Sequence, residues 1–299
     1  MTILPVVYDL AAAPITYDVM NALVVARLAA MRDGYEGFRV TFVADRFRDA
    51  TPKDKALTVE EKLWRVEHIH LALALRTKGC VGAQVSFDRR HLVFPAQPFS
   101  APFMARQLFA CAPTQDELTA FAPSKSARRR IGEWLGDIRN PVTITLRSSP
   151  VEPHRNTDAS QWLKAAEQIR DRGYDPIIVP DHDEATIGAM DYGTWPVCAL
   201  AAIDLDLRLA LYERSINLSH NGGPSFLAYF MGAPLVSFLP VDNLPTVSPD
   251  IGHMASMLGV APNGDWPHAT PGRVLIWEPA TVENIVAAFD SVTANKVAA

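Results

Sequence analysis

Short runs rich in Val and Ile alternate along this chain with longer segments in which apolar residues recur every three or four positions. Runs of the first kind suit strands that are buried on both faces of a parallel sheet, and segments of the second kind predict amphipathic helices. The alternation therefore predicts repeated βαβ units and an α/β fold.

The first half contains strands and helices in alternation up to a break at Asn140-Pro141. Thr58, with Glu61 three residues later, forms a capping-box pattern ahead of one helix, and Gly79 ends that helix. The predicted strands are residues 4–8, 38–44, 81–87 and 92–94, and the other predicted helices are residues 17–31, 115–121 and 124–138.

The second half repeats the order of strand, loop and helix that a Rossmann-like domain produces. Its predicted strands are residues 142–146, 177–179, 216–219, 235–239 and 274–277, and its predicted helices are residues 159–172, 205–214, 225–231 and 282–292. A chain of 299 residues exceeds the usual size of one hydrophobic core. We therefore predict two domains, residues 1–140 and 141–299, with a single large α/β domain as the alternative.

Composition and charge exclude some classes of protein. Hydrophobic residues make up 48% of the chain and charged residues 20%, which is typical of a globular protein. The net charge of -5 argues against a general nucleic-acid binder, which needs a broad basic field. Lys125 to Arg130 form a local basic cluster, interpreted either as a solvated helix face or as a contact for an anionic membrane surface or a phosphorylated acceptor.

Cysteine usage and hydropathy predict a cytoplasmic protein. Cys80, Cys111 and Cys198 are far apart and lack metal-ligand spacing, so we expect buried thiols, no disulfide and no zinc site. Residues 1–10 have no leader pattern, and no run of 18 uncharged apolar residues occurs. We therefore predict that the protein is cytoplasmic. As an alternative, the basic cluster could bind it to the inner face of the cytoplasmic membrane.

The segment after the strand at residues 216–219 carries the strongest chemical signal. Ligands of open parallel sheets bind beyond the carboxyl ends of the strands. In His220-Asn221-Gly222-Gly223-Pro224-Ser225, two glycines permit close backbone approach and Pro224 suits the first turn of a helix. Free N–H groups and the helix dipole at that point favour a phosphate. The alternative is a tight turn without a ligand.

Polar loops follow two further strands of the second half in equivalent positions. Arg147 could bind phosphate oxygens in a bidentate manner or pair with a surface carboxylate. Asp181 and Asp183 could order a loop, contact a ribose hydroxyl or bind a divalent cation. Convergence of the three loops favours a binding site.

Residues 210–228 and 231–235 resemble the donor-binding region of GT-B glycosyltransferases, nearest to bacterial lipopolysaccharide heptosyltransferases and related surface-polysaccharide enzymes. The resemblance covers mainly residues 141–292. It implies two Rossmann-like domains that face each other across a cleft, with the acceptor in the first and the nucleotide-sugar donor in the second. The candidate donor-site residues are Arg147, Asp181, His220, Asn221, Gly222, Gly223 and Ser225. Gly222 departs from the Ser or Thr usual there and removes one hydroxyl donor.

Members of this family generally stabilise the leaving diphosphate with helix dipoles and basic side chains, so the resemblance implies no required metal and no cofactor. An inverting transferase needs a base for the acceptor hydroxyl. Asp9, after the first strand, and Asp45, after the second, are the catalytic candidates, although each could instead be a turn or cap residue. His68 and His70 fall in a predicted helix and are interpreted as ordinary histidines.

The leading hypothesis is a glycosyltransferase that moves a sugar from a nucleotide-diphosphate sugar to a glycan or lipid-linked acceptor in surface polysaccharide biosynthesis. A non-hydrolysing nucleotide-sugar epimerase is the second hypothesis, because that class shares the architecture and the phosphate-binding turn. A third is a non-catalytic nucleotide-sugar-binding subunit. Nucleic acid is not an expected partner.

Overall fold

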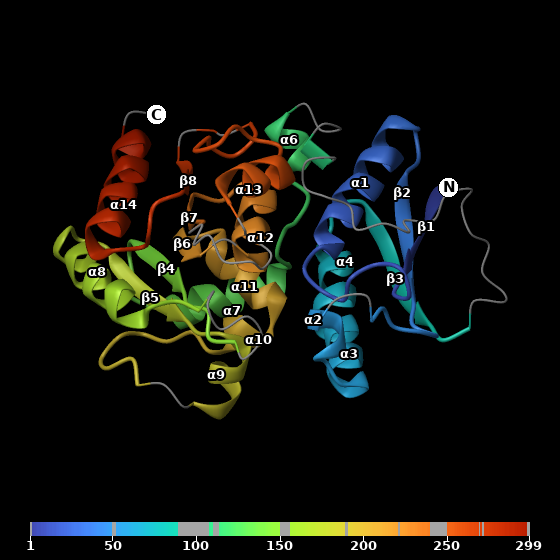
Figure 1. Cartoon of the computed structure of the whole chain (residues 1–299), viewed down its shortest axis with the longest axis horizontal. Coiled ribbons are helices and arrows are strands. Elements are labelled where there is room, and N and C mark those ends of the chain that lie inside the picture. Colours follow the sequence, from blue (N-terminus) through green and yellow to red (C-terminus); the bar gives the residue numbers. More distant parts are fainter. Residues whose placement is uncertain are drawn as a thin grey trace. The chain divides into compact units, whose positions relative to one another are not determined.

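A computed structural model describes residues 2–49, 52–88, 108–109, 114–149, 156–188, 191–220, 222–239, 250–268, 270 and 272–297 of the chain. Two compact units make up the structure, residues 1–113 with 120–122 and residues 114–119 with 123–299 (Figure 1). Each unit contains one parallel sheet, of three and five strands respectively, which confirms the predicted α/β class.

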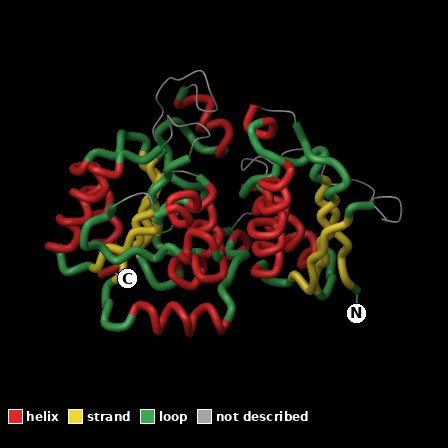
Figure 2. The backbone as a smooth tube through the Cα atoms, turned by 90° about the horizontal axis from the view of Figure 1, so that it is seen from below, coloured by secondary structure: helices red, strands yellow, loops and turns green. Residues whose placement is uncertain are grey.

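The first unit is built on a three-stranded parallel sheet in the order β1-β2-β3. Figure 2 shows its helices on one side of these strands. The strands are β1 (Ile3–Asp9), β2 (Gly37–Val43) and β3 (Cys80–Ser86), and the helices are α1 (Val19–Arg32), α2 (Pro52–Lys55), α3 (Val59–Arg65), the π-helical segment η1 (Val66–Leu71) and α4 (Ala72–Arg76).

The helix that connects β2 to β3 begins as predicted and contains an unpredicted π-helical turn. The Thr58 hydroxyl accepts the N–H of Glu61 at 3.2 Å, and a Glu61 carboxylate oxygen accepts the N–H of Thr58 at 2.6 Å, which confirms the capping box. Segment η1 places His70 in the core, where its ring meets those of Tyr8 and Phe42 edge-on at centroid distances of 5.5 and 5.4 Å. His70 is thus a core residue.

The second unit contains a five-stranded parallel sheet in the order β5-β4-β6-β7-β8. Its strands are β4 (Pro141–Thr145), β5 (Asp175–Val179), β6 (Ile216–His220), β7 (Leu235–Phe238) and β8 (Arg273–Ile276). Its helices are α6 (Gln115–Leu118), α7 (Lys125–Leu135), α8 (Ala159–Asp171), α9 (His182–Ile187), α10 (Leu200–Ile203), α11 (Leu205–Tyr212), α12 (Gly223–Met231), α13 (Ile251–Leu258) and α14 (Val282–Val297).

Two helical layers cover this sheet. Trp162 of α8 and Phe289 of α14 are fully buried in one core cluster, together with Val142 and Ile144 of β4. A second cluster joins strand β5 to helices α7, α10 and α11. This arrangement explains the Val-rich and Ile-rich strands, because side chains on both faces of the sheet are buried.

Helix α7 belongs to the second unit, whereas the boundary predicted at residue 140 placed it in the first. Its apolar side chains Ala127, Ile131 and Leu135 pack into the cluster around β5. Arg128 also forms a two-point ion pair with Glu213, at 2.7 and 2.8 Å. The break at Asn140-Pro141 is therefore a junction between a helix and a strand inside one unit.

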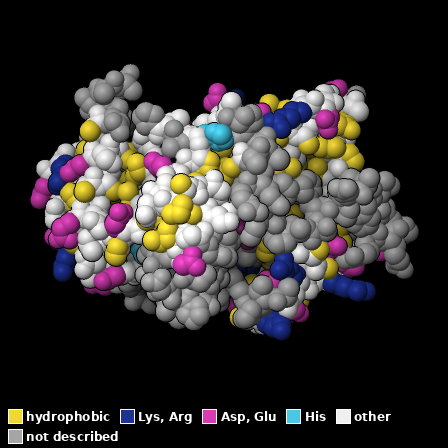
Figure 3. All heavy atoms as spheres, turned by 45° about the horizontal axis from the view of Figure 1, so that its top comes forward, with side chains coloured by type: hydrophobic (Ala, Val, Ile, Leu, Met, Phe, Trp, Pro, Cys, Tyr) yellow, Lys and Arg dark blue, Asp and Glu magenta, His cyan; other side chains and the backbone are white. Residues whose placement is uncertain are grey.

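Several further predictions can be compared with the structure. His182 and Asp183, predicted as part of a polar loop, instead begin helix α9 directly after its N-cap Asp181. Cys80 and Cys198 are free thiols, while Cys111 and the predicted strand at residues 92–94 lie outside the described residues. No helix within the described ranges has the length and apolarity needed to cross a membrane. On the face shown in Figure 3, hydrophobic side chains lie in small groups with Asp and Glu between them.

Candidate functional site

Three polar loops leave one edge of the five-stranded sheet. Strand β4 lies between β5 and β6, and the three strands are parallel, with Thr145 opposite both Val179 and Ser219. Their carboxyl ends therefore lie side by side, and the loops that follow them start from the same edge. Ligands of such sheets bind at this edge.

The turn after β6 leaves open space beside Gly222. Gly222 has an extended backbone, with φ 172° and ψ -169°, that any residue can adopt. Among the described residues, a Cβ atom built there would meet only the Cδ atom of Pro224, at 4.0 Å. Neither strain nor packing against the described residues therefore requires glycine at this position. The missing side chain keeps the backbone open to a ligand. The adjacent candidate, Asn221, lies outside the described residues.

Helix α12 begins at this turn without a side-chain cap. Its N-cap is Gly222, and its first turn contains Pro224 and no acidic residue. The N–H groups of Gly223 and Ser225 donate to no other described residue. Such amides, together with the positive end of the helix dipole, favour an anion. Side chains do cap the starts of six other helices, at Thr58, Thr114, Ser124, Asp158, Asp181 and Asp204.

Contacts of Ser225 and His220 with buried groups fix the turn after β6. The Ser225 side chain is fully buried, and its hydroxyl donates to the His220 carbonyl at 2.7 Å and lies 2.8 Å from the Ser219 hydroxyl. Since its proton goes to that carbonyl, Ser225 can offer a ligand its backbone N–H and not its hydroxyl proton. The half-buried ring of His220 packs edge-on against Trp162, with ring centroids 5.6 Å apart.

The loop after β4 is fixed by backbone contacts around Arg147. The Arg147 N–H donates to the Thr157 hydroxyl at 2.8 Å, and the Thr157 N–H donates to the Arg147 carbonyl at 2.9 Å. Ser149 exchanges two hydrogen bonds with the side-chain amide of Asn156, at 2.9 and 3.0 Å. Arg147 is thus a half-buried residue with a fixed backbone at the carboxyl edge.

Asp181 joins the loops after β4 and β5. One of its carboxylate oxygens accepts the Ser148 N–H at 2.9 Å, and the other accepts the His182 N–H at 2.7 Å and caps α9. Both oxygens therefore already bind backbone amides. This arrangement favours the loop-ordering interpretation of Asp181.

Glu184 and Tyr192 lie beside this pair of loops and escaped the sequence interpretation. One carboxylate oxygen of Glu184 accepts the Ser148 hydroxyl at 3.2 Å, whereas the other is buried without a hydrogen bond to any described residue. The Tyr192 hydroxyl is also buried without a hydrogen bond to any described residue. Burial, together with the nearby charges of Glu184 and Asp181, raises the pKa of Tyr192 to about 12. A carboxylate three residues after the cap Asp181 is the sequence signal that could have identified Glu184.

The catalytic candidates of the first unit lie at the carboxyl ends of neighbouring strands. Asp9 ends β1 and is opposite Val43 of β2, and half-buried Asp45 follows β2 by two residues. A carboxylate oxygen of Asp9 accepts the Ala11 N–H at 3.0 Å, so Asp9 also shapes the turn after β1. Arg48 braces this turn by donating its backbone N–H to Leu10 at 2.7 Å.

Two further carboxylates of the second unit, Asp204 and Asp206, have structural partners. Asp204 caps α11 by accepting the N–H groups of Asp206 and Leu207, at 2.9 and 3.2 Å. Asp206 accepts the N–H and hydroxyl of Ser124, at 2.8 and 2.6 Å. Within the described part of the chain, no three His, Cys, Asp or Glu side chains are grouped as a metal site would require.

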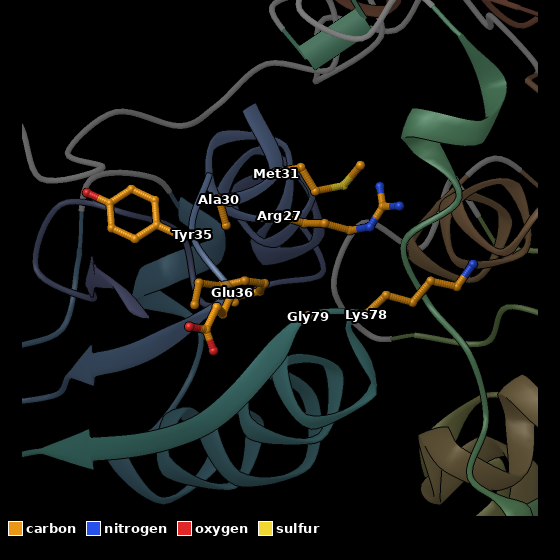
Figure 4. Close-up of a pocket in the computed structure, with 9 residues that line it drawn as sticks. Arg27, Ala30, Met31, Tyr35, Glu36, Lys78 and Gly79 are labelled. Carbon is orange, nitrogen blue, oxygen red and sulfur yellow. The ribbon is translucent and has the colours of Figure 1, made fainter. Parts of the chain in front are cut away.

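One cavity, of about 240 Å³, lies at the opposite edge of the first unit's sheet. It is lined by the end of α1 and by the residues that begin β2 and β3. Figure 4 shows Arg27, Met31 and Lys78 pointing to the same side of it, with Tyr35 and Glu36 pointing elsewhere. Because it lies at the amino ends of the strands, this cavity contains neither Asp9 nor Asp45.

Comparison with solved structures identifies the fold. The chain superposes on the Escherichia coli ADP-heptose lipopolysaccharide heptosyltransferase II with a TM-score of 0.55 and 10% identity, covering 99% of this chain and 100% of that one. It therefore has the α/β GT-B fold of two Rossmann-like domains, as the resemblance implied. No family model matches the chain, and no curated protein matches its sequence.

Two further solved structures have lower scores. The glycosyl transferase family 9 structure from Veillonella parvula matches with a TM-score of 0.48 and 10% identity, covering 97% of each chain. The Escherichia coli heptosyltransferase WaaC with ADP-2-deoxy-2-fluoro heptose matches with a TM-score of 0.42 and 12% identity, covering 98% of this chain and 100% of that one.

Proposed function

We propose that this protein is a glycosyltransferase that moves a sugar from a nucleotide-diphosphate sugar to a glycan or lipid-linked acceptor in surface polysaccharide assembly. The observation that carries the proposal is the uncapped start of α12 beside the open face of Gly222, at the ligand-binding edge of a GT-B domain.

In this proposal the second unit holds the donor. The N–H groups of Gly223 and Ser225 receive the diphosphate, and Arg147 adds a positive charge from the neighbouring loop. Together these groups stabilise the charge that develops on the leaving diphosphate, without a required metal. The buried second oxygen of Glu184 suits a ribose hydroxyl, which can donate the hydrogen bond that this oxygen lacks among the described residues.

Gly222→Val tests the diphosphate site. A Cβ atom at this position meets no described residue closer than 4.0 Å, so the variant should fold, but the side chain would fill the space where phosphate approaches. Loss of one hydrogen bond to a charged group corresponds to about 1.5–3 kcal/mol, so binding should weaken roughly tenfold or more. Calorimetry with the best ligand among ADP, UDP and GDP measures this change.

Gly222→Ala and the bare nucleoside are the matched controls. The smaller side chain should weaken binding less than valine does, and the nucleoside should lose less affinity than the nucleoside diphosphate. If wild type and Gly222→Val bind the diphosphate with equal affinity, the diphosphate site does not lie at this turn.

Asp9→Asn tests the base. Asparagine keeps the oxygen that accepts the Ala11 N–H but cannot accept the acceptor's proton, so transfer should fall about 100-fold or more. Diphosphate binding should be unchanged, because the donor site lies in the other unit. Asp45→Asn is the matched variant and should retain most activity. If the Asp9→Asn variant still transfers the sugar, Asp9 is not the base. If the donor is isomerised without transfer to an acceptor, the protein is not a glycosyltransferase.

A further inference from the structure

An aromatic side chain lies in the first turn of α12, directly after the proposed diphosphate site. Phe226 follows Ser225, and its own N–H donates to the Gly222 carbonyl at 3.1 Å. Side chains of an α-helix lean toward its N-terminus, so the Phe226 side chain leans toward the turn at Gly222. Phe226 is half-buried, whereas the other aromatic residues of α12, Tyr229 and Phe230, are fully buried. The structure thus leaves part of an aromatic side chain accessible beside this turn.

Neighbouring rings hold Phe226 in place. Its ring meets that of Trp266 edge-on, with centroids 5.2 Å apart and planes at 82°, and its centroid lies 6.0 Å from that of Phe230. Trp266 is only 2% exposed and stacks on Tyr229 at 4.7 Å. These contacts order the Phe226 ring before any ligand arrives, so a ligand that binds against it loses little free energy in ordering it.

Phe226 faces the β8 side of the second unit's sheet. Trp266, which its ring contacts, follows Asp265, and a carboxylate oxygen of Asp265 accepts the N–H of Leu275 in β8 at 2.9 Å. The loops proposed to contact the ribose and one phosphate follow β5 and β4, which lie on the other side of β6 in the order β5-β4-β6-β7-β8. The turn after β6 therefore lies between these two loops and the Phe226 ring.

We propose that Phe226 is the contact surface for the donor's sugar, and that this sugar is a pyranose with a face of C–H groups. The inference rests on the proposed function. A nucleotide sugar carries its ribose and its sugar at opposite ends of the diphosphate. With the ribose at Glu184 and the diphosphate at the turn after β6, the sugar extends toward β8, where Phe226 lies. An aromatic ring supplies apolar contact to such a face and no hydrogen bond to its hydroxyls.

Calorimetry with matched ligands tests the proposal on the full chain. The pairs are ADP with ADP-glucose, UDP with UDP-glucose or UDP-galactose, and GDP with GDP-mannose. Within a pair, the ratio of the affinity for the conjugate to that for the free diphosphate isolates the contribution of the sugar. Phe226→Leu keeps an apolar contact with Trp266 but removes the ring. For the conjugate that binds best, this variant should lower the ratio about threefold to tenfold and leave the affinity for the free diphosphate unchanged.

Phe230→Leu is the matched control, because it removes a fully buried ring from the same row. It should lower the thermal stability and leave the ratio unchanged. An unchanged ratio in Phe226→Leu overturns the sugar contact but not the proposed function. Equal losses of affinity for the conjugate and the free diphosphate would assign the ring to the nucleobase instead, which also overturns the inference. If the wild-type protein binds no diphosphate and no conjugate, the proposed function fails together with it.

Discussion

His70 is a fully buried imidazole in the core of the first unit. Burial lowers its pKa to about 4, although hydrogen bonding to the Arg65 backbone opposes the shift. The ring is therefore neutral in the folded protein, whereas a histidine in the unfolded chain titrates near pH 6.5. Between these values the unfolded state binds the additional proton. The free energy of unfolding contributed by His70 is therefore fully present above about pH 6.5 and is lost as the pH falls toward 4.

His70→Gln should remove this acid sensitivity. Between pH 7 and about pH 5 the His70 contribution in wild type should fall by about 2 kcal/mol, because the unfolded state becomes protonated and the folded state does not. Urea unfolding of both proteins at the two pH values measures the difference. His68→Gln is the matched control, since His68 is half-buried and stacks on Trp64 at 4.5 Å. An equal pH dependence of wild type and His70→Gln would show that protonation of His70 does not limit stability in acid.

At the scale of elements, local signals predicted most helices and strands. Thr58, Ser124, Asp158 and Asp204 all stand where polar caps begin helices. The π-helical segment η1 was not predicted, because such single turns are rare and lie inside an otherwise α-helical segment. Helix α10 has only four residues, too few for a periodic pattern.

The candidate site was predictable only where it depends on strand ends. The carboxyl edge could be located because parallel strands carry their loops at one edge, which identified Arg147, Asp181 and the turn at Gly222. Glu184 has a local signal, its position three residues after the cap Asp181, but its contact with Ser148 and the position of Tyr192 depend on other elements. Tyr192 reaches the site from a segment that pairs with β5 through Val197. Such contacts depend on the tertiary fold, which local sequence does not specify.

At the scale of the whole molecule, the two units do not separate where the sequence pattern breaks. Composition and turn residues favour Asn140-Pro141, but the hydrophobic contacts of α7 place that helix with β5, α10 and α11. Polar contacts agree, because Ser124 at the start of α7 is held by Asp206 at the start of α11. Both faces of the five-stranded sheet must be covered, and helix α7, which precedes Asn140-Pro141 in the sequence, covers part of one face.

This argument predicts different behaviour of two fragments of the second unit. Residues 123–299 retain α7, whereas residues 141–299 lose Ile131 and Leu135 and expose the apolar surface that they cover. Each large buried side chain contributes about 1.5–3 kcal/mol, so these two alone correspond to roughly 3–6 kcal/mol, comparable with the stability of a whole domain. The longer fragment should unfold cooperatively in urea and bind a nucleoside diphosphate, while the shorter one should be partly unfolded or aggregate. Equal stability of the two fragments would mean that α7 is not required for the core of the second unit.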